Sequence, residues 1–343
     1  MPTATLVSFR LGGLDGVSVV AESWRRILVG AGWDVRTVAG GGTADVRLPG
    51  LAWPAAGPPP TRAELDAAFD GADVVVVENL CSLPLNPPAT ESVVDALRGR
   101  PALLHHHDLP WQRERFRLVT GWPADDPAWV HVTINQLSRR QLAGRGIAAT
   151  TIYNGFDVGP PAGDGSATRR AIGVDAGARL LLHPVRAIAR KDVPAAVRLA
   201  EAVGATYWLT GPAEEGYEDT LQEVLARAGC PVVHRAAPGS MAEAYAAADA
   251  VAYPSRWEGF GNPLVEAALA RRPLAVHRYP VAVELSDLGF EWFPTDDPGP
   301  LDAFLDAPDD HLLERNRALA VGHFGIAAVA ARLLDVLARL LEP

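Results

Sequence analysis

The feature that most constrains the fold is an alternation of strand and helix patterns that runs along the chain twice. In the first series, Val74–Val77 is an uninterrupted run of β-branched residues, as is typical of a parallel strand covered on both faces. A segment rich in Pro, Gly and Ser near residues 157–167 separates the two series, and we interpret it as a domain linker. The sequence therefore predicts an α/β fold with two doubly wound, Rossmann-like domains.

The two series place the expected strands and helices at regular intervals. The first series predicts strands at Thr5–Phe9, Val35–Val38, Val74–Val77, Ala102–His105, Val130–Ile134 and Thr150–Tyr153. The second predicts strands at Leu180–His183, Thr206–Thr210, Val232–His234, Ala250–Tyr253 and Leu274–His277. Thr61 with Glu64 and Ser240 with Glu243 form capping boxes that begin two of the helices, and residues 323–341 form a final amphipathic helix.

Charge and composition exclude several classes of protein. The 41 acidic and 31 basic residues leave a net charge of −10, which argues against a nucleic-acid-binding surface. The two cysteines, Cys81 and Cys230, are too few for a disulfide framework or a zinc site. The amino-terminal residues lack the basic segment of a signal peptide, and no apolar run reaches the roughly 20 residues of a membrane span. We therefore expect a cytoplasmic protein without a transmembrane segment.

Lys191 is the single lysine among the 31 basic residues, although the arginine-rich composition is otherwise typical of a high-GC genome. Lysine is a compact charge with three donors, whereas arginine is a wide planar fork, so a narrow anion site distinguishes between them. Either this position requires an ammonium group, or the residual lysine lies there by chance. A predicted helix at 193–203 follows, which places Lys191 in a strand-to-helix loop.

The segment Pro254–Glu266 joins two carboxylates to the start of a helix. Glu258 lies in the loop after a predicted strand, Asn262 begins the helix, and Glu266 lies one turn further on. Two glycines before Asn262 expose backbone N–H groups at the positive end of the helix, which suits an oxygen-rich ligand. Carboxylates accept hydrogen bonds from hydroxyl groups, such as those of a sugar or a ribose. The alternative is that Glu258 caps the helix and Glu266 is solvated.

This segment resembles the donor-site motif of the retaining glycosyltransferases of family 4, which have the two-domain GT-B architecture. The family's P-S-x-x-E-G-F-G-x-x-x-x-E-A pattern is matched by Pro254, Ser255, Glu258, Gly259, Phe260, Gly261, Glu266 and Ala267. The resemblance implies that Glu266 accepts hydrogen bonds from the donor ribose and that Glu258 holds hydroxyls of the donor sugar. It also implies that the backbone of Gly259, Phe260, Gly261 and Asn262 contacts the same sugar.

A second match includes the lysine. Residues 184–192, PVRAIARKD, resemble the family's G-R-x-x-x-x-K-G pattern, in which the Arg and the Lys bind the nucleotide diphosphate. The resemblance implies this role for Arg186 and Lys191. It also implies that three glycines bind the donor, namely Gly13, Gly16 and Gly211. Val185 and Asp192 replace the first and last glycines of the pattern, and we expect Asp192 to act as a helix N-cap.

The run His105-His106-His107-Asp108 follows a predicted strand. Successive side chains of a strand point to opposite faces, so only His105 and His107 share one. A metal-hydrolase motif would continue with a histidine, but Leu109 follows Asp108, and we predict no metal site. By resemblance to the family, His107 contacts the transferred sugar, and the alternative is a structural histidine.

An acceptor site is predicted around residues 111–117, where three arginines lie among aromatic residues. We expect four residues to bind the acceptor: Asn79, which follows Glu78 at the end of another predicted strand, and Asp108, Trp111 and Arg113. The arginines favour an anionic or hydroxylated acceptor. The alternatives are a patch that touches a membrane surface and a solvated amphipathic helix.

The resemblance implies an acceptor-binding domain at 1–157, a nucleotide-sugar-binding domain at 158–320, and a helix at 321–343 that packs back on the first domain. It implies transfer of a hexose from a UDP- or GDP-sugar to a hydroxyl of a small-molecule, glycan or lipid-linked acceptor, with retained configuration. Arg186 and Lys191 would replace the divalent cation of other transferases, so no cofactor is expected. Glu258 and His107 would position the sugar.

Such an enzyme would be cytoplasmic or peripheral at the inner membrane face. Two other functions stay open at this point. One is a non-catalytic sugar-nucleotide-binding protein, because Val185, Asp192 and Arg272 stand where the family commonly has glycine. The other is a metal-dependent hydrolase at the histidine run.

Overall fold

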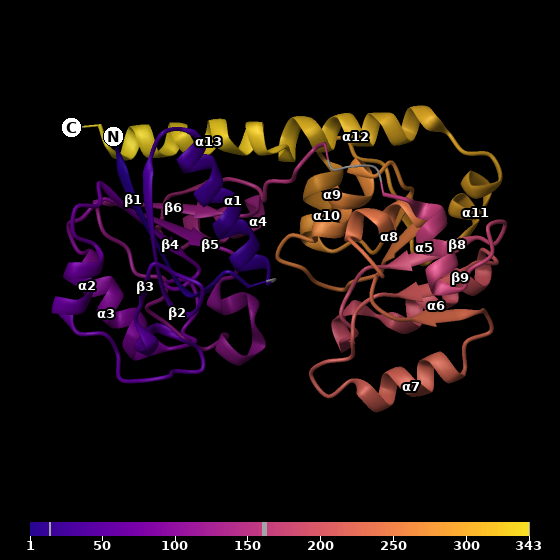
Figure 1. The fold of residues 1–343 in the computed structure, drawn as a ribbon, viewed down its shortest axis with the longest axis horizontal. Coiled ribbons are helices and arrows are strands. Elements are labelled where there is room, and N and C mark those ends of the chain that lie inside the picture. The colour runs from indigo at the N-terminus through magenta and orange to yellow at the C-terminus, as the bar shows by residue number, and fades with distance from the viewer. Residues whose placement is uncertain (14, 160–162, 343) are drawn as a thin grey trace. The chain divides into compact units, whose positions relative to one another are not determined.

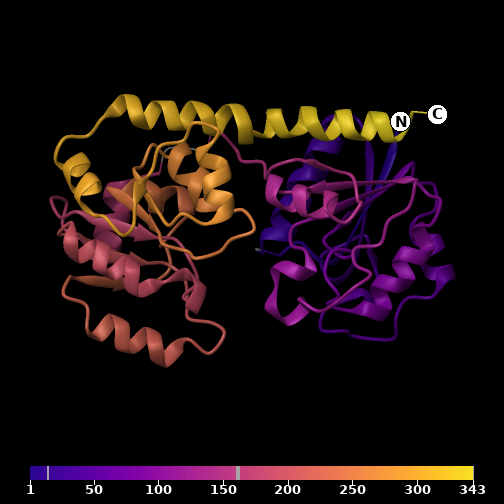
Figure 2. The same cartoon turned by 180° about the vertical axis from the view of Figure 1, so that it is seen from behind.

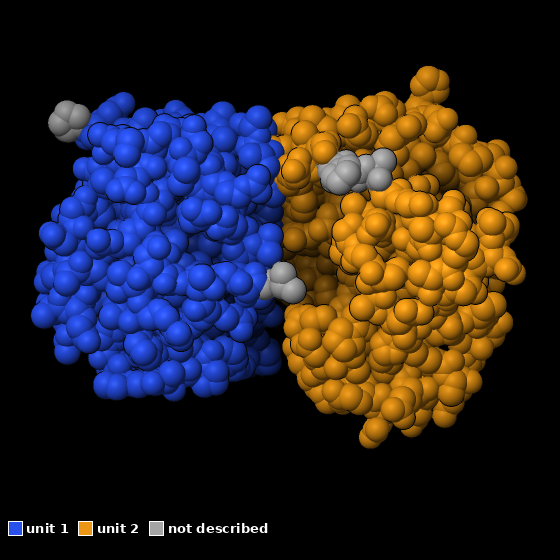
Figure 3. Space-filling model, in the orientation of Figure 1, with its two compact units in different colours: residues 1–155, 326–343 blue, residues 156–325 orange. Residues whose placement is uncertain are grey.

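The computed structural model describes residues 1–13, 15–159 and 163–342. The chain divides into two compact units: unit 1 is Met1–Gly155 with Ile326–Pro343, and unit 2 is Phe156–Gly325 (Figures 1 and 3). The predicted domains ended at residues 157 and 320, and the carboxyl-terminal segment of unit 1 begins at residue 326 instead of 321. Residues 160–162 of the predicted linker, residue 14 of the glycine-rich loop and residue 343 lie outside the described residues.

Unit 1 contains a seven-stranded sheet in the order β3-β2-β1-β4-β5-β6-β7, and its paired strands are parallel. The strands are β1 (Thr3–Leu11), β2 (Asp34–Gly42), β3 (Val46–Arg47), β4 (Val74–Glu78), β5 (Ala102–His106), β6 (Trp129–Thr133) and β7 (Ala149–Thr151). The helices are α1 (Gly16–Gly30), α2 (Arg62–Ala68), α3 (Pro87–Leu97), α4 (Gln136–Ala143) and α13 (Ile326–Leu340). The predicted capping box of Thr61 and Glu64 begins α2.

Apolar clusters cover both faces of the unit 1 sheet. Side chains alternate along β4, so that Val75 and Val77 pack with α2 and α3, whereas Val74 and Val76 pack with α1 and α13. All four valines are at most 2% exposed. The prediction that this run is a parallel strand covered on both faces is confirmed.

Unit 2 contains a six-stranded parallel sheet in the order β10-β9-β8-β11-β12-β13. The strands are β8 (Leu180–His183), β9 (Thr206–Leu209), β10 (Val232–His234), β11 (Ala250–Tyr253), β12 (Leu274–Val276) and β13 (Phe293–Pro294). The strand order reverses between β8 and β11, which is where doubly wound sheets bind ligands.

The helices of unit 2 lie on both faces of its sheet. They are α5 (Gly165–Ile172), α6 (Val193–Ala202), α7 (Glu218–Ala226), α8 (Met241–Ala247), α9 (Asn262–Leu269), α10 (Pro280–Ser286), α11 (Gly299–Asp306) and α12 (Asp310–Phe324). Figures 1 and 2 show α6 and α7 on one face and α8 and α9 on the other. The predicted capping box of Ser240 and Glu243 begins α8. The predicted α/β class with two doubly wound sheets is therefore confirmed.

The chain ends in two helices where the sequence pattern predicted one. α12 ends at Phe324, α13 begins at Ile326, and Gly325 between them is extended. Because the extended Gly325 interrupts the helical backbone, the prediction of a single helix at 323–341 is wrong. α13 lies beside α1 (Figure 1). Its Leu333 and Leu337 belong to the unit 1 core.

Within the described part of the chain, no helix has both the length and the hydropathy that a membrane span needs.

Candidate active site

The two loops at the switch point of the unit 2 sheet bring a lysine and a glutamate together. Lys191 ends a single turn, Ala189–Lys191, after β8, and Glu258 lies in the loop between β11 and α9. The Lys191 Nζ and Glu258 Oε1 atoms are 2.6 Å apart, and each side chain is 10% exposed. Lys191 also donates to the Tyr253 hydroxyl at 3.3 Å. Two residues selected from separate motifs thus form one buried ion pair.

Burial and charge act in opposite directions on this pair. Burial lowers the pKa of the Lys191 ammonium, and the Glu258 carboxylate offsets part of that effect. Burial raises the pKa of Glu258, but Lys191 and Arg190 outweigh it, so this pKa lies below its ordinary value. Glu258 is therefore ionised near neutral pH, beside an ammonium that has lost most of its hydration.

Two arginines lie close to Lys191 in the sequence. Arg186 is 53% exposed and lies 2.6 Å from Glu214, and an exposed ion pair of this kind contributes little to stability. The charge of Arg186 lowers the pKa of Lys191. Arg190 was not selected from the sequence, yet its Nη1 lies 2.6 Å from Glu258 Oε1 and donates to the Trp257 carbonyl at 2.9 Å.

Asp192 is the N-cap of α6, as predicted. Its carboxylate accepts a hydrogen bond from the Ala195 N–H at 3.3 Å. The residue has a φ of +50°, in the left-handed region that glycine adopts at the least cost. Arg256 donates to the same carboxylate at 2.9 Å. A cap and an arginine therefore account for a negative side chain next to a predicted phosphate site.

Residues 259–262 form the entry to α9. Gly261 has a φ of +96°, and a Cβ there would lie 2.2 Å from the Tyr279 hydroxyl, so only glycine fits. The Phe260 ring is buried against Phe156 and Phe324, which makes its side chain part of the core. Gly261 is the N-cap of α9, and as a glycine it has no side chain that could cap the helix, so the Glu258 cap stays an alternative prediction. The backbone of Gly259 and Asn262 stays a predicted sugar contact.

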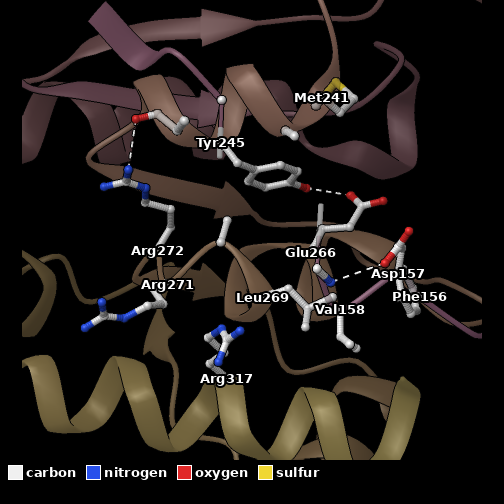
Figure 4. A pocket seen from close by; sticks show the side chains of 15 residues that line it. Phe156, Asp157, Val158, Met241, Tyr245, Glu266, Leu269, Arg271, Arg272 and Arg317 are labelled. Atoms are coloured by element: carbon white, nitrogen blue, oxygen red, sulfur yellow. Dashed lines mark hydrogen bonds between the residues drawn. The ribbon is translucent and has the colours of Figure 1, made fainter. Parts of the chain in front are cut away.

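Glu266 lines a cavity of about 550 Å³ formed by residues of α8, α9 and α12. Figure 4 shows its carboxylate and the Tyr245 hydroxyl pointing toward each other, and the hydroxyl donates to Oε2 at 2.7 Å. Burial raises the pKa of Glu266, and the Tyr245 hydrogen bond offsets part of the rise. Glu266 is thus a partly exposed residue of this cavity whose carboxylate is held by Tyr245.

Three predicted donor-binding glycines lie in strand-end loops. A Cβ on Gly211 would lie 2.3 Å from the Val185 carbonyl oxygen, to which the Gly211 N–H donates at 3.0 Å. Gly211 therefore lets the loop after β9 approach the loop that carries Arg186. Gly13 follows β1 in unit 1, and Gly16 begins α1.

At the ends of β4 and β5, unit 1 has a buried glutamate between two histidines. Glu78 Oε2 lies 2.9 Å from His105 Nδ1 and 3.1 Å from His107 Nε2. Burial raises the pKa of Glu78, but the two histidines outweigh it and lower the pKa to about 2. The prediction that His105 and His107 share a face is confirmed. The contact occupies Nε2 of His107, so Nδ1 is the ring nitrogen that would meet a ligand.

Among the described residues, Glu78, His105 and His107 are the group whose ligand atoms converge closely enough for a metal ion. The three side chains are at most 7% exposed, and Trp24 stacks on His105 with ring centroids 4.0 Å apart. A metal ion that catalyses hydrolysis needs an open coordination position for water and substrate. A site as closed as this one does not favour that role. The absence of a bound metal stays a prediction.

Asn79 contacts the backbone of the loop that carries the predicted acceptor site. It is buried, has a φ of +58°, and its Oδ1 accepts the backbone N–H of His107 at 3.0 Å and of Asp108 at 3.3 Å. Asn79 therefore fixes the loop after β5, a scaffold role that the acceptor prediction did not include.

Asp108, Trp111 and Arg113 are partly exposed. Arg113 Nη2 lies 2.7 Å from Asp108 Oδ1, and the Trp111 indole N–H donates to Gln141 at 2.8 Å. Their segment forms two short 3-10 turns, Pro110–Gln112 and Glu114–Phe116, so the alternative of an amphipathic helix at 111–117 is wrong. The acceptor role of these residues stays a prediction.

Comparison with known proteins shows which proteins this chain resembles. Residues 176–302 match the model of the family described as glycosyl transferases group 1. The mannosylglucosylglycerate synthase of Thermotoga maritima is 24% identical over 80% of this chain and 80% of its own length. That of Petrotoga mobilis is 26% identical over 64% of this chain, and the match spans 63% of its length. The structure of Anabaena HepE in complex with UDP-glucose superposes with a TM-score of 0.73 at 18% identity, over 98% of this chain and 99% of that one.

Together, the two doubly wound sheets and these likenesses define a GT-B fold. The match to the group 1 glycosyl transferase model lies within unit 2. The resemblance to family 4 glycosyltransferases, predicted from the motifs around Lys191 and Glu258, is confirmed.

Sequence reasoning missed two side chains that touch the predicted site residues, Arg190 on Glu258 and Tyr245 on Glu266. It named Glu78 beside Asn79 at a strand end, but it did not predict the contact of Glu78 with His107. Tyr245 has no motif of its own, whereas Arg190 adjoins the lysine and Glu78 ends a strand. Polar residues at the ends of adjacent parallel strands were the available signal, because such ends meet at one edge of a sheet.

Proposed function

We propose that this chain transfers a hexose from a UDP- or GDP-sugar to a hydroxyl group of an acceptor, with retained anomeric configuration and without a metal cofactor. The observation that carries the proposal is the ion pair of Lys191 and Glu258 at the switch point of the unit 2 sheet. A desolvated ammonium beside the start of a helix is suited to bind a diphosphate, and its paired carboxylate is suited to bind sugar hydroxyls.

In this proposal, the leaving diphosphate is stabilised by fixed positive charge. Lys191 is preorganised by Glu258 and Tyr253, and Arg186 gives up an exposed ion pair with Glu214 to reach the phosphates. Glu266 binds the ribose, with Tyr245 orienting its carboxylate. Because two cationic side chains supply the charge that a divalent cation supplies elsewhere, transfer proceeds without metal. Retention follows from the resemblance to family 4, in which no side-chain nucleophile is required.

The comparisons support the choice of donor. HepE was solved with UDP-glucose, and the two curated relatives are named as mannosylglucosylglycerate synthases. Both names are consistent with a hexose as the transferred group.

For the acceptor we propose a hydroxylated compound that carries a carboxylate. Arg113, Arg115 and Arg117 follow His107 closely, and guanidinium groups bind carboxylates with two parallel hydrogen bonds. Glycerate, in the names of the two relatives, is a compound of this class. His107 would hold the transferred sugar from unit 1, with Glu78 fixing its ring. The expected location is the cytoplasm, including the inner membrane face for a lipid-linked acceptor.

A panel of sugar nucleotides tests this function. UDP-, GDP-, ADP- and TDP-sugars are screened by thermal shift, since a ligand that binds the folded state raises the melting temperature. The stabilising donor is then incubated with glycerate and glycosylglycerate acceptors, and NMR gives the anomeric configuration of the product. Binding without turnover or donor hydrolysis would indicate the non-catalytic alternative, and an inverted product would contradict retention.

A further inference from the structure

Arg190 contacts the same carboxylate oxygen as the neighbouring lysine. Its Nη1 lies 2.6 Å from Glu258 Oε1, and Lys191 Nζ lies 2.6 Å from that atom as well. The side chain of Arg190 is 31% exposed, against 10% for Lys191. Two cations on one oxygen leave Oε2 as the atom of Glu258 that can accept from a ligand.

Arg190 also holds the loop that carries Glu258. Its carbonyl accepts the Arg256 N–H at 2.9 Å, and its Nη1 donates to the Trp257 carbonyl at 2.9 Å. Contacts with three successive residues, 256, 257 and 258, therefore tie the turn after β8 to the loop after β11. A change at Arg190 moves the Glu258 carboxylate, although Arg190 has no motif match of its own.

We infer that Arg190 is a positioning residue, which keeps Glu258 in place and ionised while Lys191 is drawn toward the donor diphosphate. This inference rests on the proposed function. Without Arg190, a diphosphate that attracts the Lys191 ammonium would leave a buried carboxylate unpaired and close to negative phosphates. With Arg190 in place, Glu258 keeps a permanent counter-ion and presents Oε2 to the sugar hydroxyls.

The chemistry of arginine suits this task better than that of lysine. A guanidinium stays protonated at any working pH, and its Nη1 contacts two acceptors at once, the Trp257 carbonyl and Glu258 Oε1. The other ionisable groups that face Glu258 are Lys191, Tyr253 and Tyr279. Burial, and then the charge of Glu258, raise the pKa of both tyrosines well above its ordinary value, so they stay neutral. Arg190 therefore stays charged at any working pH, and in this proposal it stays paired with Glu258 when the donor binds.

The test compares R190Q and R190K with R198Q, a control at an exposed arginine on α6. Calorimetry measures the Kd of UDP or GDP and of the matching sugar nucleotide, and kinetics measures kcat/KM for the donor against pH. We expect R190Q to bind the nucleoside diphosphate within about twofold of wild type. We expect kcat/KM for the sugar nucleotide to fall about 30-fold, and the acid limb of the pH profile to move to higher pH, because Glu258 loses a cation that lowers its pKa.

R190K separates charge from geometry. It keeps the positive charge but loses the longer, planar guanidinium whose Nη1 makes both contacts, so we expect a wild-type acid limb and a loss in kcat/KM of about tenfold. If thermal melting shows that R190Q does not fold, the inference is tested by the loss of kcat/KM in R190K alone. The inference is overturned if the Arg190 variants match R198Q, or if nucleoside diphosphate and sugar nucleotide lose affinity equally. A wild-type protein that binds neither UDP nor GDP would instead contradict the proposed function.

Discussion

Each sheet has a buried glutamate at its carboxyl edge, beside the point where the strand order reverses, but the two have different partners. Glu258 in unit 2 meets Lys191 and Arg190, whereas Glu78 in unit 1 meets His105 and His107. Both carboxyl groups have a lowered pKa. Arginine and lysine carry a permanent charge near neutral pH, but imidazole does not. Unit 2 thus presents a net positive cluster, while unit 1 presents an ionised carboxylate between two imidazoles.

The largest effect is expected when the ammonium group of Lys191 in unit 2 is removed. Lys191→Ala is expected to lower kcat/KM for transfer by about 1,000-fold, because a preorganised charge at the leaving group is lost. Thermal melting checks that the fold is kept, and R198Q is the matched control. Turnover close to that of wild type would contradict the assignment of Lys191 to the phosphates.

Lowering the pH tests the buried glutamate of unit 1. The pKa of Glu78 is lowered from 4.5 to about 2, so its contribution to stability is complete above pH 4.5 and is lost as the pH falls toward 2. A shift of this size corresponds to roughly 3 kcal/mol at most. Burial lowers the pKa of His105, His106 and His131, and stability from these groups is also lost as the pH falls below 6.5.

Urea unfolding at several pH values measures this effect. We expect the free energy of unfolding to fall from pH 6.5 downward, and to fall less steeply below pH 4.5 in Glu78→Gln than in wild type. Identical slopes in the two proteins would mean that Glu78 is not ionised in the folded state.

Glu266 tests whether the cavity of Figure 4 takes part in nucleotide binding. Glu266→Ala is expected to raise the Kd of the nucleoside diphosphate about tenfold, since it removes one charged hydrogen-bond acceptor. Tyr245→Phe keeps the carboxylate but loses its donor, so we expect a smaller rise. An unchanged Kd in Glu266→Ala by calorimetry would refute the ribose role.

The smallest expected effect concerns metal. Because Lys191 and Arg186 supply the positive charge, EDTA is expected to leave the transfer rate unchanged. Metal analysis of the purified protein gives an independent check on Glu78, His105 and His107. Loss of activity with EDTA, restored by a divalent cation, would contradict the metal-free mechanism.

The predictions from sequence were most accurate where a motif and a local rule coincide. Lys191 was selected by its uniqueness and by a motif, and Asp192 was predicted as an N-cap from its place before a helix. The strand Ala250–Tyr253 was predicted with its observed bounds because it is a short apolar run between polar segments. Such features depend on neighbours within a few residues.

What was missed depends on contacts between distant residues. Arg190 and Glu258 are far apart in the sequence, and the pairing of β4 with β5 is what brings Glu78 opposite His105. The final helix was predicted as continuous because its apolar periodicity crosses Gly325, where the chain passes from one unit to the other. No local spacing encodes these contacts.

A crystal structure with a bound UDP- or GDP-sugar tests the central claim most directly. The account predicts a diphosphate oxygen within hydrogen-bond distance of Lys191 Nζ, a sugar hydroxyl on Glu258 Oε2, and Arg190 still on Oε1. A donor bound elsewhere, with the Lys191–Glu258 pair untouched, would contradict it.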